Sequence, residues 1–172
     1  LQSLNKLSST EVSCHIIPQA TSSDLDKLKH YFDKVNEGQK LSQADKFKVE
    51  ENVGQESTIR AKKVADEIGY SLAARKTVPR TLSFGAWKDA FIENEEHAAQ
   101  ALKALHSAYR GEFTMAVFTS VFEFINAFDG TVDQNRLVSG LKYVGADELN
   151  SRSRGKNRTV NGRKAVQDAY EG

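Results

Sequence analysis

The chain has 172 residues, 39% of them hydrophobic, and its 24 Lys and Arg residues nearly balance its 23 Asp and Glu residues. This length suits one domain with a sizeable core, and the balanced charge excludes a polycation. The single cysteine, Cys14, cannot form an internal disulfide, so nothing in the sequence requires an oxidising compartment.

The N-terminal region combines a polar stretch with the start of a helical domain. Residues 1–21 are rich in Ser and Thr, and we expect an N-terminal arm or a strap on the protein's own core. A helical core domain is predicted over residues 22–150. Its first helix opens with Ser23 as N-cap. A second, more polar helix follows Ser42 and ends at Gly54.

Two further helices are predicted in the middle of the chain. One covers residues 57–76 with an apolar stripe, and Pro79 bars its continuation. From Ser83 to Tyr109 the apolar positions stay on one side, which predicts a single helix of roughly 25 residues ending near Gly111. The Ala-rich second half of this helix allows close approach of the next one, so we expect a helical hairpin.

The most apolar stretch is 113–128, FTMAVFTSVFEFINAF, in which eleven of sixteen residues are Ala, Val, Ile, Met or Phe. Phe113, Phe124 and Phe128 belong to a stripe with helical spacing, and other apolar residues cover the opposite side. A helix that is apolar nearly all round belongs in a core, and this one is too short for a bilayer, which needs about 20 residues. We therefore predict an all-α, single-domain bundle of about six helices around this central apolar helix, with N- and C-terminal arms.

The segment after the central helix predicts a turn and another helix. Asp133 is a candidate N-cap for a short amphipathic helix that Gly145 ends. The residue spacing that begins at Asp129 resembles that of a calcium-binding loop. However, Gly140 stands at the twelfth position, where such a loop needs Glu. We therefore expect a plain helix–helix turn. A DNA-binding helix-turn-helix stays open as an alternative, because residues 134–136, Gln-Asn-Arg, are suitable base readers at a helix start.

Residues 151–172 are predicted to form a basic C-terminal arm, with a short helix from Arg163 to Glu171. Residues 151–164 hold six cations and no acid. Such a segment cannot offset its ordering entropy alone, so we expect a polyanion or a partner surface to hold it. The candidate nucleic-acid-binding residues are Arg152, Arg154, Lys156, Arg158, Arg163 and Lys164 in this segment, and Arg60, Lys63, Arg75, Lys76 and Arg80 along and just after the third helix.

The acidic residues are also segregated. Asp89, Glu93 and Glu96 share one face of the long predicted helix, with Glu95 beside them. This layout lets acidic faces meet basic faces of neighbouring copies while other basic residues contact phosphates.

A short motif follows the central helix. Ala127-Phe128-Asp129-Gly130 resembles the Phe-Asp-Gly stretch of filamentous plant-virus coat proteins. The resemblance covers four residues, and neither the spacing before it nor the basic segment after it matches that family's pattern. The chain is therefore not identified as a member of that family.

Enzyme signatures are missing from the sequence. It has no glycine-rich phosphate loop, no paired-cysteine zinc spacing and no HExxH motif. We therefore expect no enzymatic activity, no cofactor and no small-molecule substrate. Because neither a signal-peptide pattern nor an apolar run of membrane length is present, we expect a protein of the cytoplasm or of a virion that has no membrane partner.

The charge layout predicts a structural role. The first hypothesis is a self-assembling nucleocapsid or coat-type protein, a homo-oligomer or filament, that binds the phosphates of single-stranded RNA or DNA without sequence specificity. The alternative is a helical adaptor or regulatory module whose basic arm docks an acidic partner.

Overall fold

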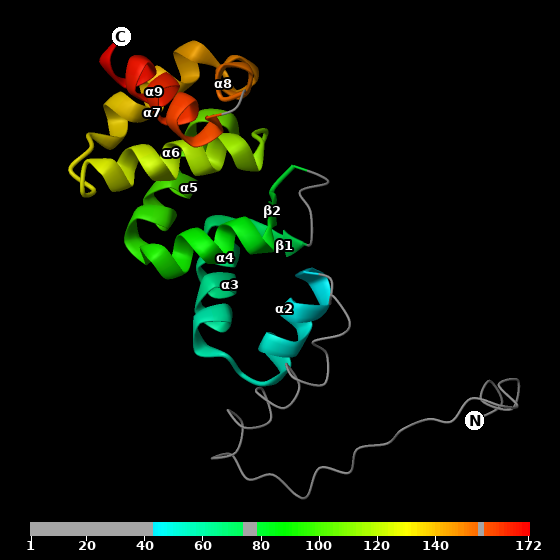
Figure 1. Ribbon diagram of the computed structural model, residues 1–172. Helices are drawn as coiled ribbons and strands as arrows, with labels where there is room; N and C mark the ends of the chain where they lie inside the picture. The colour runs from blue at the N-terminus through cyan, green and yellow to red at the C-terminus, as the bar shows by residue number, and fades with distance from the viewer. Residues whose placement is uncertain (1–42, 74–78, 155–156) are drawn as a thin grey trace, which may run out of the picture. The chain divides into compact units, whose positions relative to one another are not determined.

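Figure 1 shows the computed structural model of the protein, in which residues 43–73, 79–154 and 157–172 are described. These residues belong to one compact unit, Leu41–Gly172. The predicted N-terminal arm (1–21), the helix that opens at Ser23 and the N-cap Ser42 lie outside the described residues. Among the candidate cations, Arg75, Lys76 and Lys156 also lie outside them.

The all-α class is confirmed. The described residues form eight helices rather than the expected six or so: α2 (Gln43–Asn52), α3 (Glu56–Ile68), α4 (Phe84–Glu93), α5 (Glu95–Tyr109), α6 (Met115–Ala127), α7 (Gln134–Val144), α8 (Ala146–Arg152) and α9 (Arg158–Glu171). A two-stranded parallel sheet, β1 (Ser71–Ala73) with β2 (Thr81–Ser83), places Leu72 opposite Leu82 and was not predicted. No helix in the described ranges has the length and apolar character that crossing a bilayer requires.

The helix predicted over residues 57–76 ends earlier than expected. Gly69 adopts a left-handed conformation with φ of 94°, and its backbone N–H bonds to the last turn of α3. Glycine takes this conformation without steric cost, so it ends a helix readily. The chain then turns into β1, where pairing with β2 replaces the hydrogen bonds that further helix would have made.

The single long helix predicted from Ser83 to Tyr109 is wrong, because the chain breaks at Asn94 into α4 and α5. Asn94 is extended (φ −156°, ψ 103°), and its side-chain oxygen accepts a hydrogen bond from the backbone N–H of His97 at 3.1 Å. Asparagine is a strong N-cap, and the acidic first turn after it suits the positive end of the helix dipole. Because of this break, the side chains of α4 and α5 do not share the common faces that one continuous helix would have given them.

The central apolar helix is confirmed as α6. Its buried residues cover both sides of the helix, and Thr114 caps its start by accepting a hydrogen bond from the N–H of Val117. Helix α6 packs against α5 and α9, and α7 packs against the same two helices. Phe128, which was expected in the buried stripe, lies just after the helix end and is 45% exposed.

The C-terminal part of the chain is held by its own fold. Helix α9 begins at Arg158, five residues before the predicted start, and lies against α6 (Figure 1). Val166 is fully buried. Gly162 brings the two backbones close, since a Cβ there would lie 2.0 Å from the Ser120 hydroxyl oxygen. These apolar contacts offset the entropy cost of ordering α9. Contrary to the prediction, no polyanion or partner surface is needed to hold this part of the segment.

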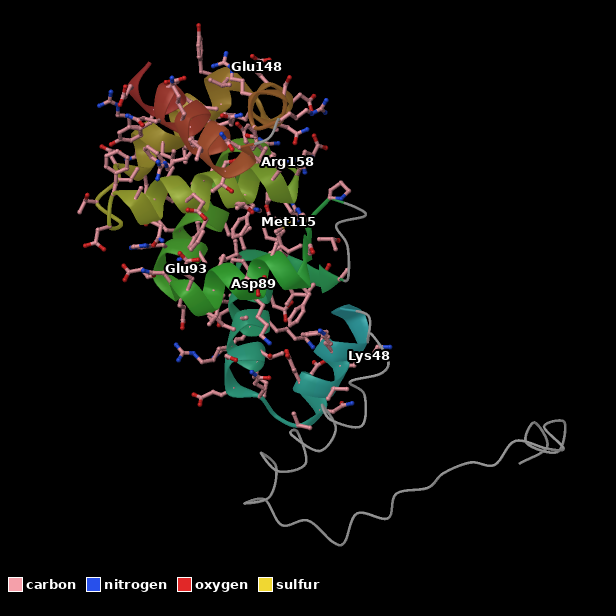
Figure 2. All side chains as sticks on the ribbon, viewed as in Figure 1. Lys48, Asp89, Glu93, Met115, Glu148 and Arg158 are labelled. Carbon is pink, nitrogen blue, oxygen red and sulfur yellow. The ribbon has the colours of Figure 1, made fainter. Side chains whose placement is uncertain are left out.

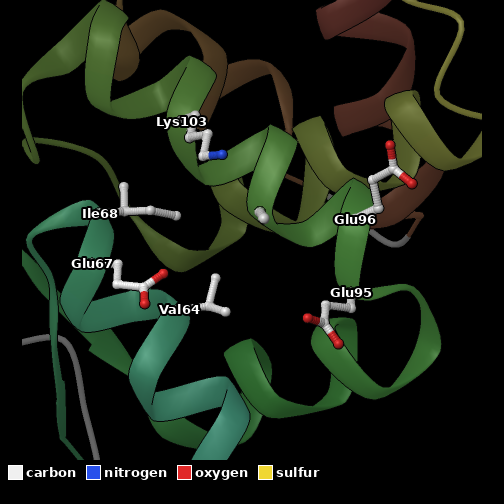
Figure 3. Close-up of a pocket in the computed structure, with 7 residues that line it drawn as sticks. Val64, Glu67, Ile68, Glu95, Glu96 and Lys103 are labelled. Atoms are coloured by element: carbon white, nitrogen blue, oxygen red, sulfur yellow. The ribbon is translucent and has the colours of Figure 1, made fainter.

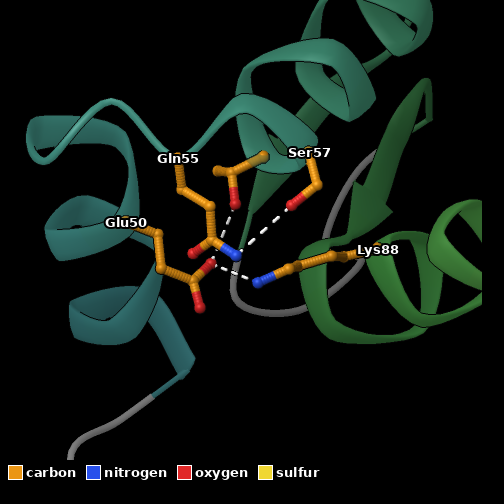
Figure 4. A network of polar contacts seen from close by, with 5 residues as sticks. Glu50, Gln55, Ser57 and Lys88 are labelled. Atoms are coloured by element: carbon orange, nitrogen blue, oxygen red, sulfur yellow. Dashed lines mark hydrogen bonds and ion pairs between the residues drawn. The ribbon is translucent and has the colours of Figure 1, made fainter. Parts of the chain in front are cut away.

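A polar network joins α2, α3 and α4 (Figure 4). Glu50 of α2 forms an ion pair with Lys88 of α4 and accepts a hydrogen bond from the Thr58 hydroxyl of α3 at 3.0 Å. Both charged side chains are mostly covered, with exposures of 20% for Glu50 and 13% for Lys88. Nearby, the Gln55 amide donates to the Ser57 hydroxyl at 3.3 Å.

Two tyrosines, Tyr70 (buried) and Tyr109 (partly buried), make the stability of the protein depend on pH in the alkaline range. Burial raises the pKa of Tyr70 to about 12, and burial also raises the pKa of Tyr109, whose hydroxyl donates to the Leu141 carbonyl at 2.6 Å. Because the folded pKa exceeds the unfolded value of about 10, the folded state holds these protons more tightly, and their contribution to stability is lost as pH rises above about 10.

We therefore expect the Tyr70→Phe/Tyr109→Phe variant to lose less stability than the parent protein between pH 10 and 12. Urea unfolding at several pH values measures this difference. All other side chains are the same in both proteins, so parallel curves for the two would contradict the prediction.

Candidate functional site

The candidate interface is a set of cations at the junction of α8 and α9. We call it the α8–α9 basic surface, and its members are Arg152, Arg154, Arg158, Arg163 and Lys164. Among the described residues only Arg152 of this set has a carboxylate partner, Glu148, whose Oε1 lies 2.8 Å from the Arg152 Nε. The other four side chains are exposed and form no ion pair with any residue that the structure describes.

A buried serine anchors this junction to the central helix. Ser153, 3% exposed, follows α8 and donates its hydroxyl to the Leu149 carbonyl at 2.7 Å. The same hydroxyl lies 3.3 Å from that of Ser120 on α6. On the far side of the junction the Asn161 amide donates to the Arg154 carbonyl at 3.1 Å. Ser153 therefore ties the junction to the central helix, and Asn161 ties its two sides to each other.

The packing of α9 decides which of its residues face water. Its buried side is made of small residues and Val166. Val160, Arg163 and Lys164 have the i, i+3, i+4 spacing of one helix face, and all three are exposed. Val160 is 56% exposed. We call this stripe the outer face of α9.

The cations of α3 differ from those of α9, because they form ion pairs with carboxylates. Arg60 Nη2 lies 2.5 Å from Glu95 Oε2, and Lys63 Nζ lies 3.9 Å from Glu67 Oε1. Arg80 is exposed in a left-handed conformation beside Gly111. Helix α3 packs against α2, α4, α5 and β1, whereas α9 packs against α6, α7 and α8. The structure therefore does not join the two predicted basic sets into one surface.

A groove between α3 and α5 has a volume of about 540 Å³ (Figure 3). Val64, Ile68 and Ala99 give it an apolar lining, and Glu67, Glu95, Glu96 and Lys103 add charged groups. Arg60 and Lys63 offset two of the carboxylates, so the groove carries little net charge. No cluster of potential metal ligands occurs here or elsewhere in the described residues.

The residues of the possible helix-turn-helix make contacts within the protein itself. Asp133 caps α7 as predicted, accepting from the N–H of Arg136 at 3.0 Å. The Arg136 guanidinium donates to the carbonyls of Tyr170 and Glu171 at 2.7 and 3.1 Å, and it lies 4.8 Å from the centre of the Tyr170 ring. The side-chain nitrogen of Gln134 is buried. Arg136 therefore caps the C-terminal end of α9 and is not free to read a base. The sequence spacing did not reveal this capping role.

Comparison of the chain with protein-family models, with curated proteins and with solved structures finds no match.

Proposed function

We propose that this protein is a non-enzymatic structural protein that binds the phosphate backbone of single-stranded RNA or DNA and self-assembles, in the manner of a nucleocapsid or coat protein. The observation that carries the proposal is the α8–α9 basic surface, where four cations lack a carboxylate partner among the described residues while their backbone is anchored to the core.

Unpaired arginines on a rigid support are suited to phosphate. Guanidinium groups bind phosphate oxygens with two parallel hydrogen bonds, and each neutralised phosphate releases condensed counterions. Arg154 and Arg158 flank the junction, with Lys156 between them in the sequence. A cation already held by Glu or Asp would have to break that pair first, which sets the α3 cations apart from these two.

The second candidate function is a module that docks an acidic protein partner. The exposed Val160 supports it, because a phosphate backbone offers no apolar surface to cover this side chain. The two functions predict different responses to salt and to nucleic acid.

Removing Arg154 and Arg158 tests the nucleic-acid function. We expect the double alanine variant to bind a single-stranded oligonucleotide more weakly, with the slope of log K against log salt reduced by about 1.4, since each lost contact contributes about 0.7. Fluorescence anisotropy between about 50 and 200 mM salt measures both effects. The fold is expected to persist, because both side chains are exposed.

The matched control is Arg60→Ala/Lys63→Ala, which removes the same charge from cations that carboxylates already hold. It should change the slope much less. Failure of the parent protein to bind RNA or DNA even at the lowest salt would exclude this function and leave the acidic protein partner.

A further inference from the structure

A second groove lies between α5 and α7 and has a volume of about 440 Å³. We call it the α5–α7 groove. Its volume falls within the range of about 300–1,000 Å³ that is usual for small-molecule sites. Ala99, Ala104 and Val138 contribute apolar lining, and Glu96, Lys103 and Gln134 contribute polar groups. The groove therefore combines a small apolar surface with a few polar side chains, the usual composition of a ligand site.

Two hydrogen bonds fix how α5 and α7 lie along this groove. The Gln100 amide donates to the Gly130 carbonyl, just before α7, at 3.4 Å. Nine residues further along α5, the Tyr109 hydroxyl donates to the Leu141 carbonyl, near the end of α7, at 2.6 Å. The two helices therefore run in the same direction, and Lys103, which follows Gln100 by about one turn, lies level with the first turn of α7.

The groove contains one carboxylate and one ammonium group that are not paired with each other. Glu96 and Lys103 are both exposed, and neither forms an ion pair with any residue in the described ranges. They are seven residues apart, so they lie on the same face of α5 and are separated by about 10 Å along its axis. Figure 3 shows both side chains on α5. A lining with one charge of each sign is complementary to a zwitterion, whereas a phosphate chain would meet the Glu96 carboxylate.

Gln134, in the first turn of α7, gives the groove an unpaired hydrogen-bond donor. Its side-chain nitrogen is buried and has no hydrogen-bond partner in the part of the chain that the structure describes. An unpaired buried donor is costly, and most such groups in proteins have a partner. Because no acceptor within the described chain holds this nitrogen, the side chain can turn toward an oxygen atom of a ligand in the groove.

We propose that the α5–α7 groove binds a short peptide with free ends. The terminal ammonium of the peptide pairs with Glu96, its terminal carboxylate pairs with Lys103, and Gln134 donates its amide to the same carboxylate. An extended chain rises about 3.3–3.6 Å per residue, so about three residues span the distance between the two charges. Ala104 and Val138 suit small side chains, since the groove offers them only a modest apolar surface.

This site goes beyond the proposed function and does not depend on it. The groove belongs to α5 and α7, whereas the α8–α9 basic surface includes Arg158 and the Glu148 partner of Arg152, both labelled in Figure 2. A protein that binds the peptide and not nucleic acid, or the reverse, would support one proposal and refute the other.

Trialanine is the probe, and an NMR titration of the full chain at low salt is the measurement. We expect saturable shifts of amide signals in α5 and α7, with a Kd of about 1 mM or lower. Glu96→Gln and Lys103→Gln should each raise the Kd by about 10-fold or more, because each removes a charge-assisted contact. Trialanine that is acetylated at its N-terminus and amidated at its C-terminus lacks both charges and should not bind measurably.

Glu67→Gln is the matched control, since Glu67 lines the groove between α3 and α5 but not the α5–α7 groove. It should leave the Kd unchanged. Circular dichroism checks the fold of the variants, which is expected to persist at these exposed positions. Three results would each overturn the proposal: no saturable shifts with trialanine, equal binding of the blocked peptide, or equal effects of Glu67→Gln and Glu96→Gln. An oligonucleotide titration of the same samples tests the α8–α9 basic surface separately.

Discussion

Replacing Trp87 by alanine is expected to lower the free energy of unfolding by about 3–5 kcal/mol. The indole is fully buried, with its ring centre 5.6 Å from that of Phe91 and 5.7 Å from that of Phe118. Its Nε1–H donates to the Ala61 carbonyl of α3 at 2.8 Å. The side chain thus joins α3, α4 and α6, and its removal opens a cavity where the three meet. Urea denaturation followed by far-ultraviolet circular dichroism measures the loss.

Trp87→Phe is the control that separates packing from hydrogen bonding. It keeps an aromatic ring but removes the hydrogen bond to the Ala61 carbonyl, which still accepts the intrahelical bond of α3, so we expect a cost of about 0.5–1.5 kcal/mol from this bond. A loss below about 1 kcal/mol for Trp87→Ala would show that the three helices do not depend on this side chain.

Gly140→Ala is expected to destabilise the protein by about 1–3 kcal/mol, although alanine is the better helix former by about 1 kcal/mol. Gly140 lies in α7, and a Cβ there would lie 1.9 Å from the Ala169 carbonyl oxygen of α9. The obstacle is backbone, which cannot swing away like a flexible side chain, so the two helices have to separate. Thermal and urea unfolding measure the effect.

Ser139→Ala is the matched control for Gly140→Ala. Ser139 precedes Gly140 in the same helix but is exposed, so alanine there gains helix propensity without meeting α9. We expect unchanged or slightly higher stability for Ser139→Ala. Equal behaviour of the two variants would mean that α7 and α9 do not approach as closely as the structure shows.

The link from α7 to α9 matters for the proposed function. Helix α9 carries Arg158 and the outer face, and its far end is held by Arg136 through the carbonyls of Tyr170 and Glu171. Loosening this packing in Gly140→Ala should therefore weaken oligonucleotide binding, which requires the α9 cations to keep their positions.

Local patterns in the sequence predicted the features that depend on neighbouring residues. The nearly all-round apolar character of 113–128 indicated the central helix, because no exposed helix can place that much apolar surface in water. Asp133 and Gly145 marked the ends of α7, since capping is a short-range hydrogen-bonding property. The cap at Asn94 carried a similar local signal, but the continuous apolar stripe on either side of it favoured one long helix.

The tertiary structure alone decided which charges are free and where they face. Arg60 and Glu95 are 35 residues apart, and nothing in their local sequence indicates that they pair. The pairing of β1 with β2 and the packing of α9 on α6 likewise join segments that are distant in the chain. Sequence composition alone determined that the protein is helical with a buried apolar centre and a basic C-terminal segment. Only long-range packing separated the unpaired cations of α8 and α9 from the paired ones of α3, because an ion pair depends on distance in space rather than along the chain.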